Sequence, residues 1–358
     1  MKKRVVIGMS GGVDSSAAAC ILLERGYDVI GVTLQIWQDE TPDAIQAQSG
    51  CCGLTAVEDA RRVAERLDIP YYVLNFKTDF RNYVIDYFVR EYMAGRTPNP
   101  CIACNRHVKW ESLLSKVRQL DADYIATGHY ARTGRHPDTG RLCISCSAAQ
   151  GKDQSYALYP LTQAQLAATL LPAGDYRKED IRRFAAERNL PVAHKPDSQD
   201  ICFVPDGDYA RFIKEYTYAE SPEGDFIDET GGVLGRHKGV IHYTVGQRKG
   251  LGIAFGRPLY VKSINAPDNT VTLAEDVSVS KMIVKDVNWM AFEPFQGERR
   301  LSVKIRYSHK AAGCTAFVER GLDSRIRCRF DVPQRAVTPG QAAVFYDGEY
   351  VAFGGIIE

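Results

Sequence analysis

Long apolar runs are absent from this 358-residue chain, and no stretch approaches the roughly eighteen consecutive apolar residues of a membrane-spanning helix. The N-terminus also lacks the apolar core of a secretory signal. Internal repeats and low-complexity tracts are missing, which argues against a solenoid or a disordered tail. These absences predict a cytoplasmic protein with no membrane partner. A length of 358 residues is enough for two or three domains, each with its own core.

Strong net charge is also missing, since the formal charge at pH 7 is +1. The charge is unevenly distributed, because residues 281–340 hold twelve Lys and Arg against six Asp and Glu. A basic segment of this kind can meet a polyanion or can be a solvated surface of mixed charge. The ten cysteines are too sparse in a chain of this length for a disulfide scaffold. Each is therefore a core residue, a metal ligand or a reactive thiol.

The first two hundred residues alternate short β-rich runs with helical patterns. The β-rich runs lie at residues 4–7, 27–34, 71–76 and 124–127, and the helical patterns at 17–25, 55–67, 80–95, 110–117, 163–171 and 178–189. Alternation of this kind predicts an α/β domain with a doubly wound parallel sheet, whose ligands bind at the carboxyl ends of the strands. A long polar loop is expected from Gln38 to Gly50, and another from Ala193 to Gly207.

The pattern changes after residue 207, where glycines punctuate short β segments. From about residue 275 strand patterns repeat, for example over 301–307, 315–319, 325–331 and 342–346, which favours a small β-barrel. We therefore predict three domains: a catalytic nucleotide-binding domain over 1–207, a small central α+β domain over 208–274 and a C-terminal β-barrel over 275–358.

The most informative stretch runs from Gly8 to Ser16, with the sequence Gly-Met-Ser-Gly-Gly-Val-Asp-Ser-Ser. It follows a β-branched run and precedes a helical run, so it predicts a glycine-rich turn between a strand and a helix N-terminus. Backbone amides of such a turn and the helix dipole bind phosphate, and Ser15 and Ser16 can cap the helix or bind phosphate oxygens. The stretch lacks the Gly-Lys-Ser/Thr ending of a Walker motif, so a mononucleotide-kinase function is disfavoured.

Two cysteines are candidates for sulfur chemistry. Cys104 precedes the helix that contains Trp110, and we expect it near that helix's N-terminus, with basic residues close by in sequence. Both factors favour the thiolate, which is the nucleophile. Cys202 lies on the polar loop 193–207, where a thiol can swing between a sulfur donor and an acceptor.

Structural alternatives remain for the other cysteines. The pairs Cys101–Cys104 and Cys143–Cys146 have the spacing of zinc or iron–sulfur ligands. The second pair lies in a strand-like run, where side chains three positions apart point to opposite faces, so we predict no metal site. Three further cysteines are expected in the core, namely Cys20, Cys314 and Cys328. Cys51 and Cys52 receive no role.

Several motifs occur together and in order along the chain. They are Ser-Gly-Gly-Val-Asp-Ser at 10–15, Pro-Asn-Pro at 98–100 with Cys-Asn at 104–105, Ala-Thr-Gly-His-Tyr at 126–130, Lys-Asp-Gln-Ser-Tyr at 152–156, Asp-Ser at 197–198 with Ile-Cys-Phe at 201–203, Thr-Val-Gly-Gln-Arg-Lys-Gly-Leu-Gly at 244–252 and Thr-Pro-Gly-Gln at 338–341. The first resembles the pyrophosphate loop of the ATP pyrophosphatase superfamily. Together the motifs resemble the bacterial tRNA-specific 2-thiouridylases, over nearly the whole chain.

The resemblance implies ATP-dependent 2-thiolation of the wobble uridine (position 34) in the tRNAs for lysine, glutamate and glutamine. ATP, with Mg²⁺ to neutralise its phosphates, adenylylates the C2 oxygen, and a persulfide sulfur then displaces AMP. By similarity Cys202 receives sulfur from an upstream carrier, and Cys104 resolves the persulfide by forming a Cys104–Cys202 disulfide. A monomeric enzyme is expected.

The resemblance also assigns binding residues. The nucleotide site is expected to comprise Gly8, Met9, Ser10, Gly11, Gly12, Val13, Asp14, Ser15, Leu34 and Gly128. The tRNA contacts are expected to comprise Asn99, Pro100, Cys101, His129, Lys152, Asp153, Gln154, Arg306, Tyr307 and Gln341, the last three in the barrel. Several relatives carry Asp where this chain has Cys101, so a carboxylate acid or base is not expected there. Cys101 is instead a second candidate for the nucleophile.

Two other functions remain open from the residues alone. One is a different ATP-dependent ligase or thiolase, such as a 4-thiouridine or argininosuccinate-type enzyme, which leaves Cys202 and the barrel without a role. The other is a tRNA-binding or sulfur-carrier protein with a regulatory nucleotide site. The first predicts AMP formation driven by a small molecule or another tRNA position, and the second predicts salt-sensitive tRNA binding without a thiolated product.

Overall fold

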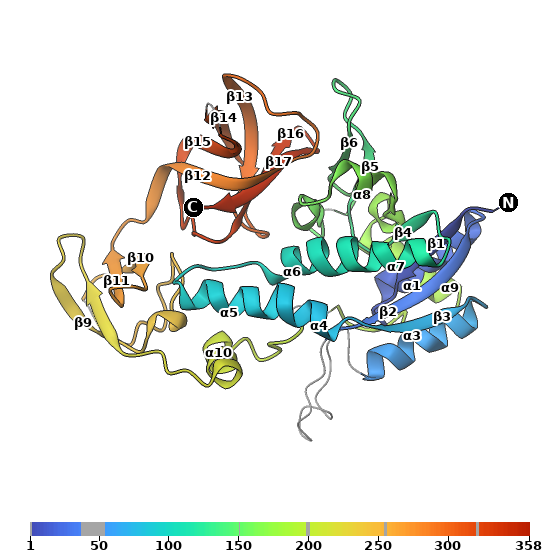
Figure 1. Cartoon of the computed structure of the whole chain (residues 1–358), viewed down its shortest axis with the longest axis horizontal. Coiled ribbons are helices and arrows are strands. Elements are labelled where there is room, and N and C mark those ends of the chain that lie inside the picture. The colour runs from blue at the N-terminus through green and yellow to red at the C-terminus, as the bar shows by residue number, and fades with distance from the viewer. Residues whose placement is uncertain (1, 37–53, 150, 198–200, 254–255, 320–321) are drawn as a thin grey trace. The chain divides into compact units, whose positions relative to one another are not determined.

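The computed structural model describes residues 2–36, 54–149, 151–197, 201–253, 256–319 and 322–358 (Figure 1). The expected loop from Gln38 to Gly50, and Cys51 and Cys52, lie outside these residues. The chain divides into two compact units. Unit 1 comprises residues 1–84, 101–206 and 349–351, and unit 2 comprises residues 85–100, 207–348 and 352–358.

Unit 1 contains a parallel five-stranded sheet. In sheet order its strands are β3 (Tyr71–Asn75), β2 (Asp28–Gln35), β1 (Arg4–Gly8), β4 (Tyr124–Ala126) and β7 (Thr169–Leu170). The three apolar residues of the central strand β1, Val5 to Ile7, are fully buried. Continuous apolar runs of this kind are typical of strands covered on both faces. The predicted parallel sheet is confirmed.

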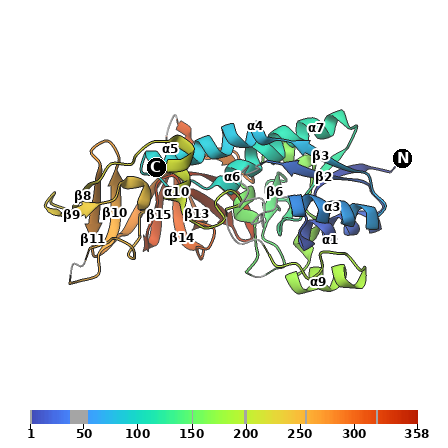
Figure 2. The same cartoon turned by 90° about the horizontal axis from the view of Figure 1, so that it is seen from below.

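Helices cover both faces of this sheet. Figure 2 shows α1 (Val13–Glu24), α3 (Leu54–Arg66) and α9 (Lys178–Glu187) on one face, and α4 (Lys77–Phe80) and α7 (Leu114–Gln119) on the other. Helix α1 is buried along most of its length, because it lies between the sheet and α9. This arrangement is the predicted doubly wound fold.

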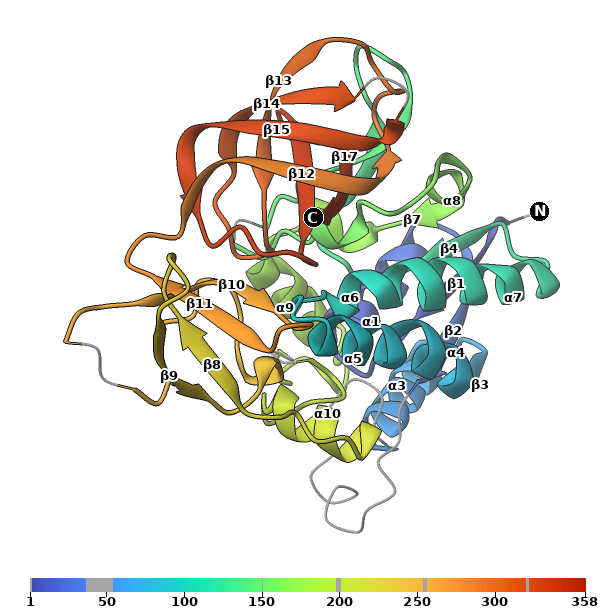
Figure 3. The same ribbon diagram turned by 60° about the vertical axis from the view of Figure 1, so that its left-hand side comes forward.

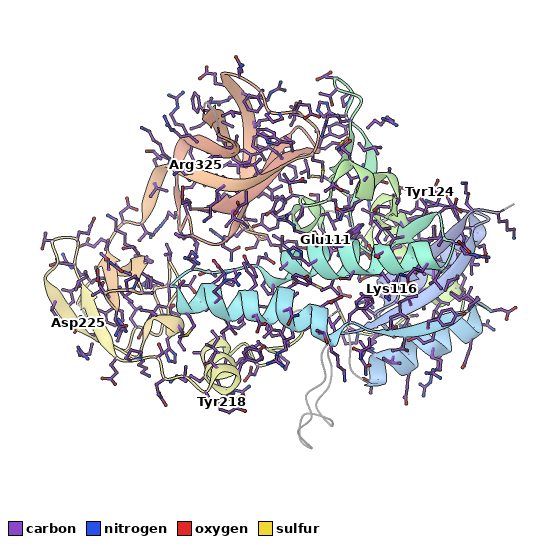
Figure 4. All side chains as sticks on the ribbon, in the orientation of Figure 1. Glu111, Lys116, Tyr124, Tyr218, Asp225 and Arg325 are labelled. Carbon is purple, nitrogen blue, oxygen red and sulfur yellow. The ribbon has the colours of Figure 1, made fainter. Side chains whose placement is uncertain are left out.

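The remaining elements of unit 1 include a helix that changes its winding. The segment α6 (Pro100–Ala103) continues directly into the π-helix η2 (Cys104–Leu113) and then α7, and Figure 4 labels Glu111 and Lys116 along this helix. A hairpin of β5 (Arg132–Arg135) and β6 (Leu142–Ser145) follows β4. The short elements η3 (Ser155–Leu158), α8 (Gln163–Ala167) and η4 (Pro172–Asp175) complete the unit. The helix predicted over 163–171 is too long, because residues 169–170 form strand β7 beside β4.

Unit 2 begins with the last residue of the π-helix η1 (Arg81–Ile85) and the helix α5 (Asp86–Met93). Helix α5 packs against α10 (Tyr209–Thr217), where the rings of Phe88 and Tyr209 meet edge-on at 5.7 Å between centroids. A four-stranded sheet follows in the order β10 (Tyr260–Asn265), β11 (Thr270–Ala274), β8 (Gly224–Ile227) and β9 (Val233–His237), with η5 (Val240–His242) after β9. None of the described helices has the length and hydropathy needed to cross a bilayer.

The last strands of unit 2 form a closed barrel (Figure 3). Its strands are β12 (Ser278–Trp289), β13 (Glu298–Lys304), β14 (Ala312–Glu319), β15 (Leu322–Arg335), β16 (Ala342–Asp347) and β17 (Tyr350–Ile357). The order is β12-β15-β14-β13-β16-β17, and pairing of β12 with β17 closes the ring. Cys314 and Cys328 lie fully buried inside, where a hydrogen bond between them and burial raise the pKa of Cys328. The predicted barrel and its core cysteines are confirmed.

Candidate functional site

The candidate phosphate loop lies at the carboxyl edge of the unit 1 sheet. The chain passes from β1 to β2 on one side, whereas β4 lies on the other side of β1, so the strand order reverses at β1. Open α/β sheets bind ligands at this point. Gly8 ends β1, Leu34 is the penultimate residue of β2, and Gly128 follows β4 by two residues. The fold therefore gathers these three predicted nucleotide-binding residues at the ends of adjacent strands.

At two positions of the site a neighbouring backbone segment lies so close that only glycine fits. Gly11 has a φ of +65°, and a Cβ there would lie 2.3 Å from the carbonyl oxygen of Ala56. A Cβ on Gly128 would lie 2.6 Å from the backbone nitrogen of Ser15. Both contacts are with backbone atoms, which cannot move aside as a side chain can. The strand β4 end thus packs directly against the start of α1.

Hydrogen bonds hold the loop in one conformation. The backbone of Met9 donates to the carbonyl of Val32 at 2.8 Å, and the Ser10 amide donates to Oγ of Ser15 at 3.2 Å. Gly12 is the N-cap of α1 and has no side chain to cap the helix. Ser15 and Ser16 lie inside the first turn and donate back to the Gly12 carbonyl, so neither caps the helix, and the alternative that they bind phosphate oxygens stays a prediction. No side chain caps the start of α1, which therefore suits an anion.

The carboxylate of Asp14 is the charged centre of this loop. Lys178 donates to both of its oxygens, at 2.6 and 2.8 Å, and the Tyr130 hydroxyl donates to Oδ1 at 2.6 Å. Burial and the neighbouring Asp14 raise the pKa of Tyr130, so the phenol stays protonated as a donor. The ammonium of Lys178 is nearly buried, which strengthens both interactions. Sequence reasoning gave no role to Lys178 or Tyr130.

A second carboxylate, Asp197, meets the same lysine. Its oxygens accept from Lys178, Arg182 and Lys152 at 2.8, 2.8 and 2.9 Å. Burial opposes ionisation of Asp197, but the hydrogen bonds from Lys178 and Lys152 outweigh it and lower its pKa to about 2. Asp197 is therefore a carboxylate at any physiological pH, and Lys178 bridges two negative charges.

The two cysteines of the first pair occupy different environments. The helix begins at Pro100, so Cys101 lies in its first turn and is exposed, whereas Cys104 lies in the second turn and is 8% exposed. Cys104 therefore lies near the helix N-terminus, as expected, but one turn farther in than Cys101, which stands closer to the positive end of the helix dipole. Proline at the first helical position was the available signal. The identity of the nucleophile stays a prediction.

Cys202 lies on the loop after α9, as expected, and is half-buried. The next residue, Phe203, is buried and packs edge-on against Phe80 of α4 at 5.7 Å between ring centroids. This contact fixes the backbone beside the thiol. The pairing of Cys104 with Cys202 stays a prediction.

The residues around the start of η2 form a polar cluster. The amide of Asn105 donates to the Ala157 carbonyl at 2.9 Å and accepts from Lys109 at 2.9 Å. His129, which follows β4, is in hydrogen-bond contact with Thr127 at 2.6 Å. Burial, with the nearby charge of Lys109, lowers the pKa of His129 well below its usual range. His129 is therefore neutral at pH 7, and a contact with RNA there would be a hydrogen bond or stacking.

Two side chains of the motif at 152–154 make hydrogen bonds within unit 1. Asp153 accepts from the Ser147 amide and the Ser155 hydroxyl, at 3.0 and 2.7 Å. Gln154 accepts from the Tyr130 amide at 2.8 Å and so fixes the residue that holds Asp14. Both side chains have structural roles that sequence reasoning missed, and their predicted tRNA contacts stay predictions.

The remaining predicted tRNA contacts lie in unit 2. Arg306 and Tyr307 are exposed after β13, and 46% of Tyr307 is accessible. The backbone of Gln341 bonds to Thr338 and Ile357 before β16. Asn99 is half-buried and Pro100 is buried where α6 begins. The tRNA contacts predicted for these residues stay predictions.

Models of three domain families match the chain in sequence. They are described as a tRNA methyl transferase HUP domain over residues 3–206, a tRNA methyl transferase PRC-barrel domain over residues 210–275 and an aminomethyltransferase beta-barrel domain over residues 279–357. The three matched ranges correspond to the parallel sheet, the small central sheet and the barrel, in that order.

Similar curated proteins bear one name. The tRNA-specific 2-thiouridylase MnmA of Lachnoclostridium phytofermentans is 58% identical over 99% of both chains. Those of Acetivibrio thermocellus and Clostridioides difficile are 53% and 51% identical over 100% of this chain and 99% of their own. Among solved structures, NMN synthetase from Francisella tularensis is similar over 59% of this chain and 75% of its own, at 17% identity and a TM-score of 0.35, which is too low to support a shared function.

Proposed function

Since the chain belongs to the tRNA-specific 2-thiouridylase family, an enzyme family that thiolates uridine in tRNA, we propose that it acts on the C2 position of the wobble uridine (position 34) in the tRNAs for lysine, glutamate and glutamine. The observation that supports this most directly is the loop from Gly8 to Ser15. It stands at the carboxyl edge of the sheet, before a helix start that no side chain caps. Such a site suits the phosphates of ATP.

Activation of the base is the first step that we propose. The C2 oxygen attacks the α-phosphorus of ATP, the α–β phosphoanhydride bond breaks, and pyrophosphate leaves. The loop amides hold the phosphates, while Leu34 and Gly128 line the pocket for adenine or ribose. Mg²⁺ would neutralise phosphate charge and would be held mainly by the phosphates, because Asp14 is already engaged by Lys178 and Tyr130.

Sulfur transfer is the second step. A carrier protein leaves a persulfide on Cys202, and its terminal sulfur attacks C2, so that a C–S bond forms and AMP leaves. Cys104 then attacks the inner sulfur of Cys202, which breaks the persulfide S–S bond and leaves a Cys104–Cys202 disulfide. An external dithiol returns two electrons and resets the enzyme.

The tRNA would be held by residues of both units. Asn99, Pro100 and Cys101 are proposed to contact the target base, and His129 and the motif at 152–154 are proposed to contact the tRNA. Arg306, Tyr307 and Gln341 are proposed to hold the tRNA at the barrel, where the exposed Arg306 and Tyr307 suit a phosphate and a base. The three domains are proposed to end at residues 207, 274 and 358, and the enzyme to act as a monomer.

The test is incubation of the protein with unmodified lysine tRNA, ATP, Mg²⁺ and a persulfide donor, followed by mass spectrometry of the digested nucleosides and, to locate the modified position, of ribonuclease fragments of the tRNA. Replacement of oxygen by sulfur has a different mass from addition of a methyl group, so the experiment also separates thiolation from the methyl transfer in the family-model descriptions. We expect 2-thiouridine at the wobble position only with ATP present. Sulfur at another uridine, or a methylated nucleoside, would contradict the proposal.

A further inference from the structure

The segment that leads to Cys202 is tied to the phosphate loop at two points. At the first, Lys178 joins Asp197 to Asp14, with its ammonium 2.8 Å from the former and 2.6 Å from the latter. At the second, Lys195 donates to the carbonyl oxygen of Gly11 at 3.0 Å. On the side of Cys202 these contacts involve Lys195 and Asp197, which are two positions apart. On the other side both contacts reach the phosphate loop.

The charged side chains at the first of these points are largely shielded from solvent. The side chains of Lys178 and Asp197 are 10% and 21% exposed, and the ring of Tyr130 lies 5.6 Å from the ammonium of Lys178. Charge pairs with this burial are screened little by salt and are costly to break singly. Asp197 keeps Lys152 and Arg182 as further partners, so it stays compensated when Lys178 moves.

Nucleotide phosphates would compete for Lys178. A triphosphate beside Asp14 adds several negative charges within reach of the nearest buried cation, and the ammonium would then divide between phosphate, Asp14 and Asp197. A change at Lys178 reaches Asp197, which precedes Cys202 by five residues. After Cys202 the ring of Phe203 packs on Phe80, so the thiol lies between two positions, Asp197 and Phe203, that contact other parts of unit 1.

We propose that Lys178 and Asp197 are positioning residues that couple occupancy of the phosphate loop to the reactivity of the Cys202 thiol. The inference rests on the proposed function, in which the loop binds ATP and Cys202 carries sulfur. It gives the enzyme an order of events, because the sulfur-bearing residue responds to the nucleotide before transfer.

The test measures the alkylation rate of Cys202 in the full-length protein, by mass spectrometry of its peptide, with and without a non-hydrolysable ATP analogue. We expect the analogue to change this rate on the order of tenfold in the wild type. Asp197→Asn should reduce the response to less than about twofold while still binding the analogue. The exposed Cys101 in the same sample reports whether the reagent itself is affected.

A matched control is available on the same helix. Asp180 pairs with Arg183 on the surface of α9 at 2.7 Å and touches neither the loop nor Asp197, so Asp180→Asn should respond as the wild type does. If Asp197→Asn fails to fold, which labelling of the buried Cys20 would reveal, Lys178→Gln replaces it with the same expected loss.

An unchanged response in the variants, or no response in the wild type, overturns the coupling. Failure of the proposed function is seen separately, as absence of 2-thiouridine from the wild-type reaction. A wild type that thiolates tRNA but shows no analogue effect on Cys202 refutes the coupling alone.

Discussion

Replacing Gly128 by alanine is the sharpest test of the predicted nucleotide site. The added Cβ would lie 2.6 Å from the Ser15 nitrogen, 2.7 Å from the Asp14 carbonyl carbon and 2.9 Å from the Ser15 Cα. All three are backbone atoms, so no rotamer change relieves the contact. Ordinary van der Waals contact begins at 3.4 Å, and the start of α1 must therefore retreat by 0.8 Å.

Such overpacking costs about 1–3 kcal/mol of unfolding free energy. For a unit of this size that lowers the melting temperature by about 2–4 °C per kcal/mol. The displaced amides also miss the phosphate positions, so ATP affinity should fall by more than tenfold, since about 1.4 kcal/mol suffices for that. Differential scanning fluorimetry and calorimetric titration with ATP measure the two effects.

Gly134→Ala is the matched control. Gly134 lies in β5 of the same unit, and a Cβ there would meet nothing within 4 Å. We expect this variant to match the wild type in melting temperature and ATP affinity. If Gly128→Ala behaves like Gly134→Ala, the packing of β4 against the loop has no bearing on nucleotide binding, and the site assignment for Gly128 is refuted.

The remaining predictions concern the cysteines, the barrel and acid stability. Cys202→Ser should abolish 2-thiouridine but keep tRNA-dependent pyrophosphate release, and loss of both would make Cys202 structural. Cys104→Ser should abolish thiolation while Cys101→Ser keeps it; the reverse result would move the nucleophile to the first helical turn. Arg306→Ala should weaken tRNA binding and lower its salt slope by about 1 in a titration series, and an unchanged slope would remove Arg306 from the binding surface. Because the pKa of Asp197 falls from 3.8 to about 2 on folding, its carboxylate adds about 2 kcal/mol above pH 4, which is lost between pH 4 and pH 2. Denaturant titration should therefore find a smaller difference between wild type and Asp197→Asn at pH 2 than at pH 7, and a constant difference would show that ionisation of Asp197 is not involved.

Local sequence patterns predicted the elements whose conformation depends only on their own residues. The apolar run of β1 predicts a strand and the glycines after it predict a turn, and neither prediction needs information from another part of the chain. The helix expected over 163–171 shows the limit of this reasoning. Thr169 and Leu170 pair with Ile125 and Ala126 instead, and Trp110 donates to the Thr169 hydroxyl at 2.8 Å. Partners this distant in sequence override a local helical period.

The charged network of the site could not be predicted for the same reason. Lys178 lies 164 residues from Asp14, and nothing in the pattern of α9 distinguishes it from a surface lysine. The motif containing Asp197 drew attention to Cys202, not to the carboxylate. Pairing of this kind is fixed by how α9 packs on α1, which is a tertiary property.

The discontinuity of the two units has a consequence for synthesis and fragmentation. Unit 2 takes residues 85–100 from within the first third of the chain, and unit 1 takes residues 349–351 from near its end, where Tyr350 pairs with Ser145. A fragment ending at residue 207 would leave Phe88 and Tyr92 of α5 without Tyr209, their aromatic neighbour. On the ribosome α5 must likewise wait for α10 to emerge, and the hairpin β5–β6 must wait for nearly the last residues. Chaperone demand during translation should therefore persist until nearly the whole chain has emerged, and a premature stop in the barrel before residue 349 would leave both units unfinished.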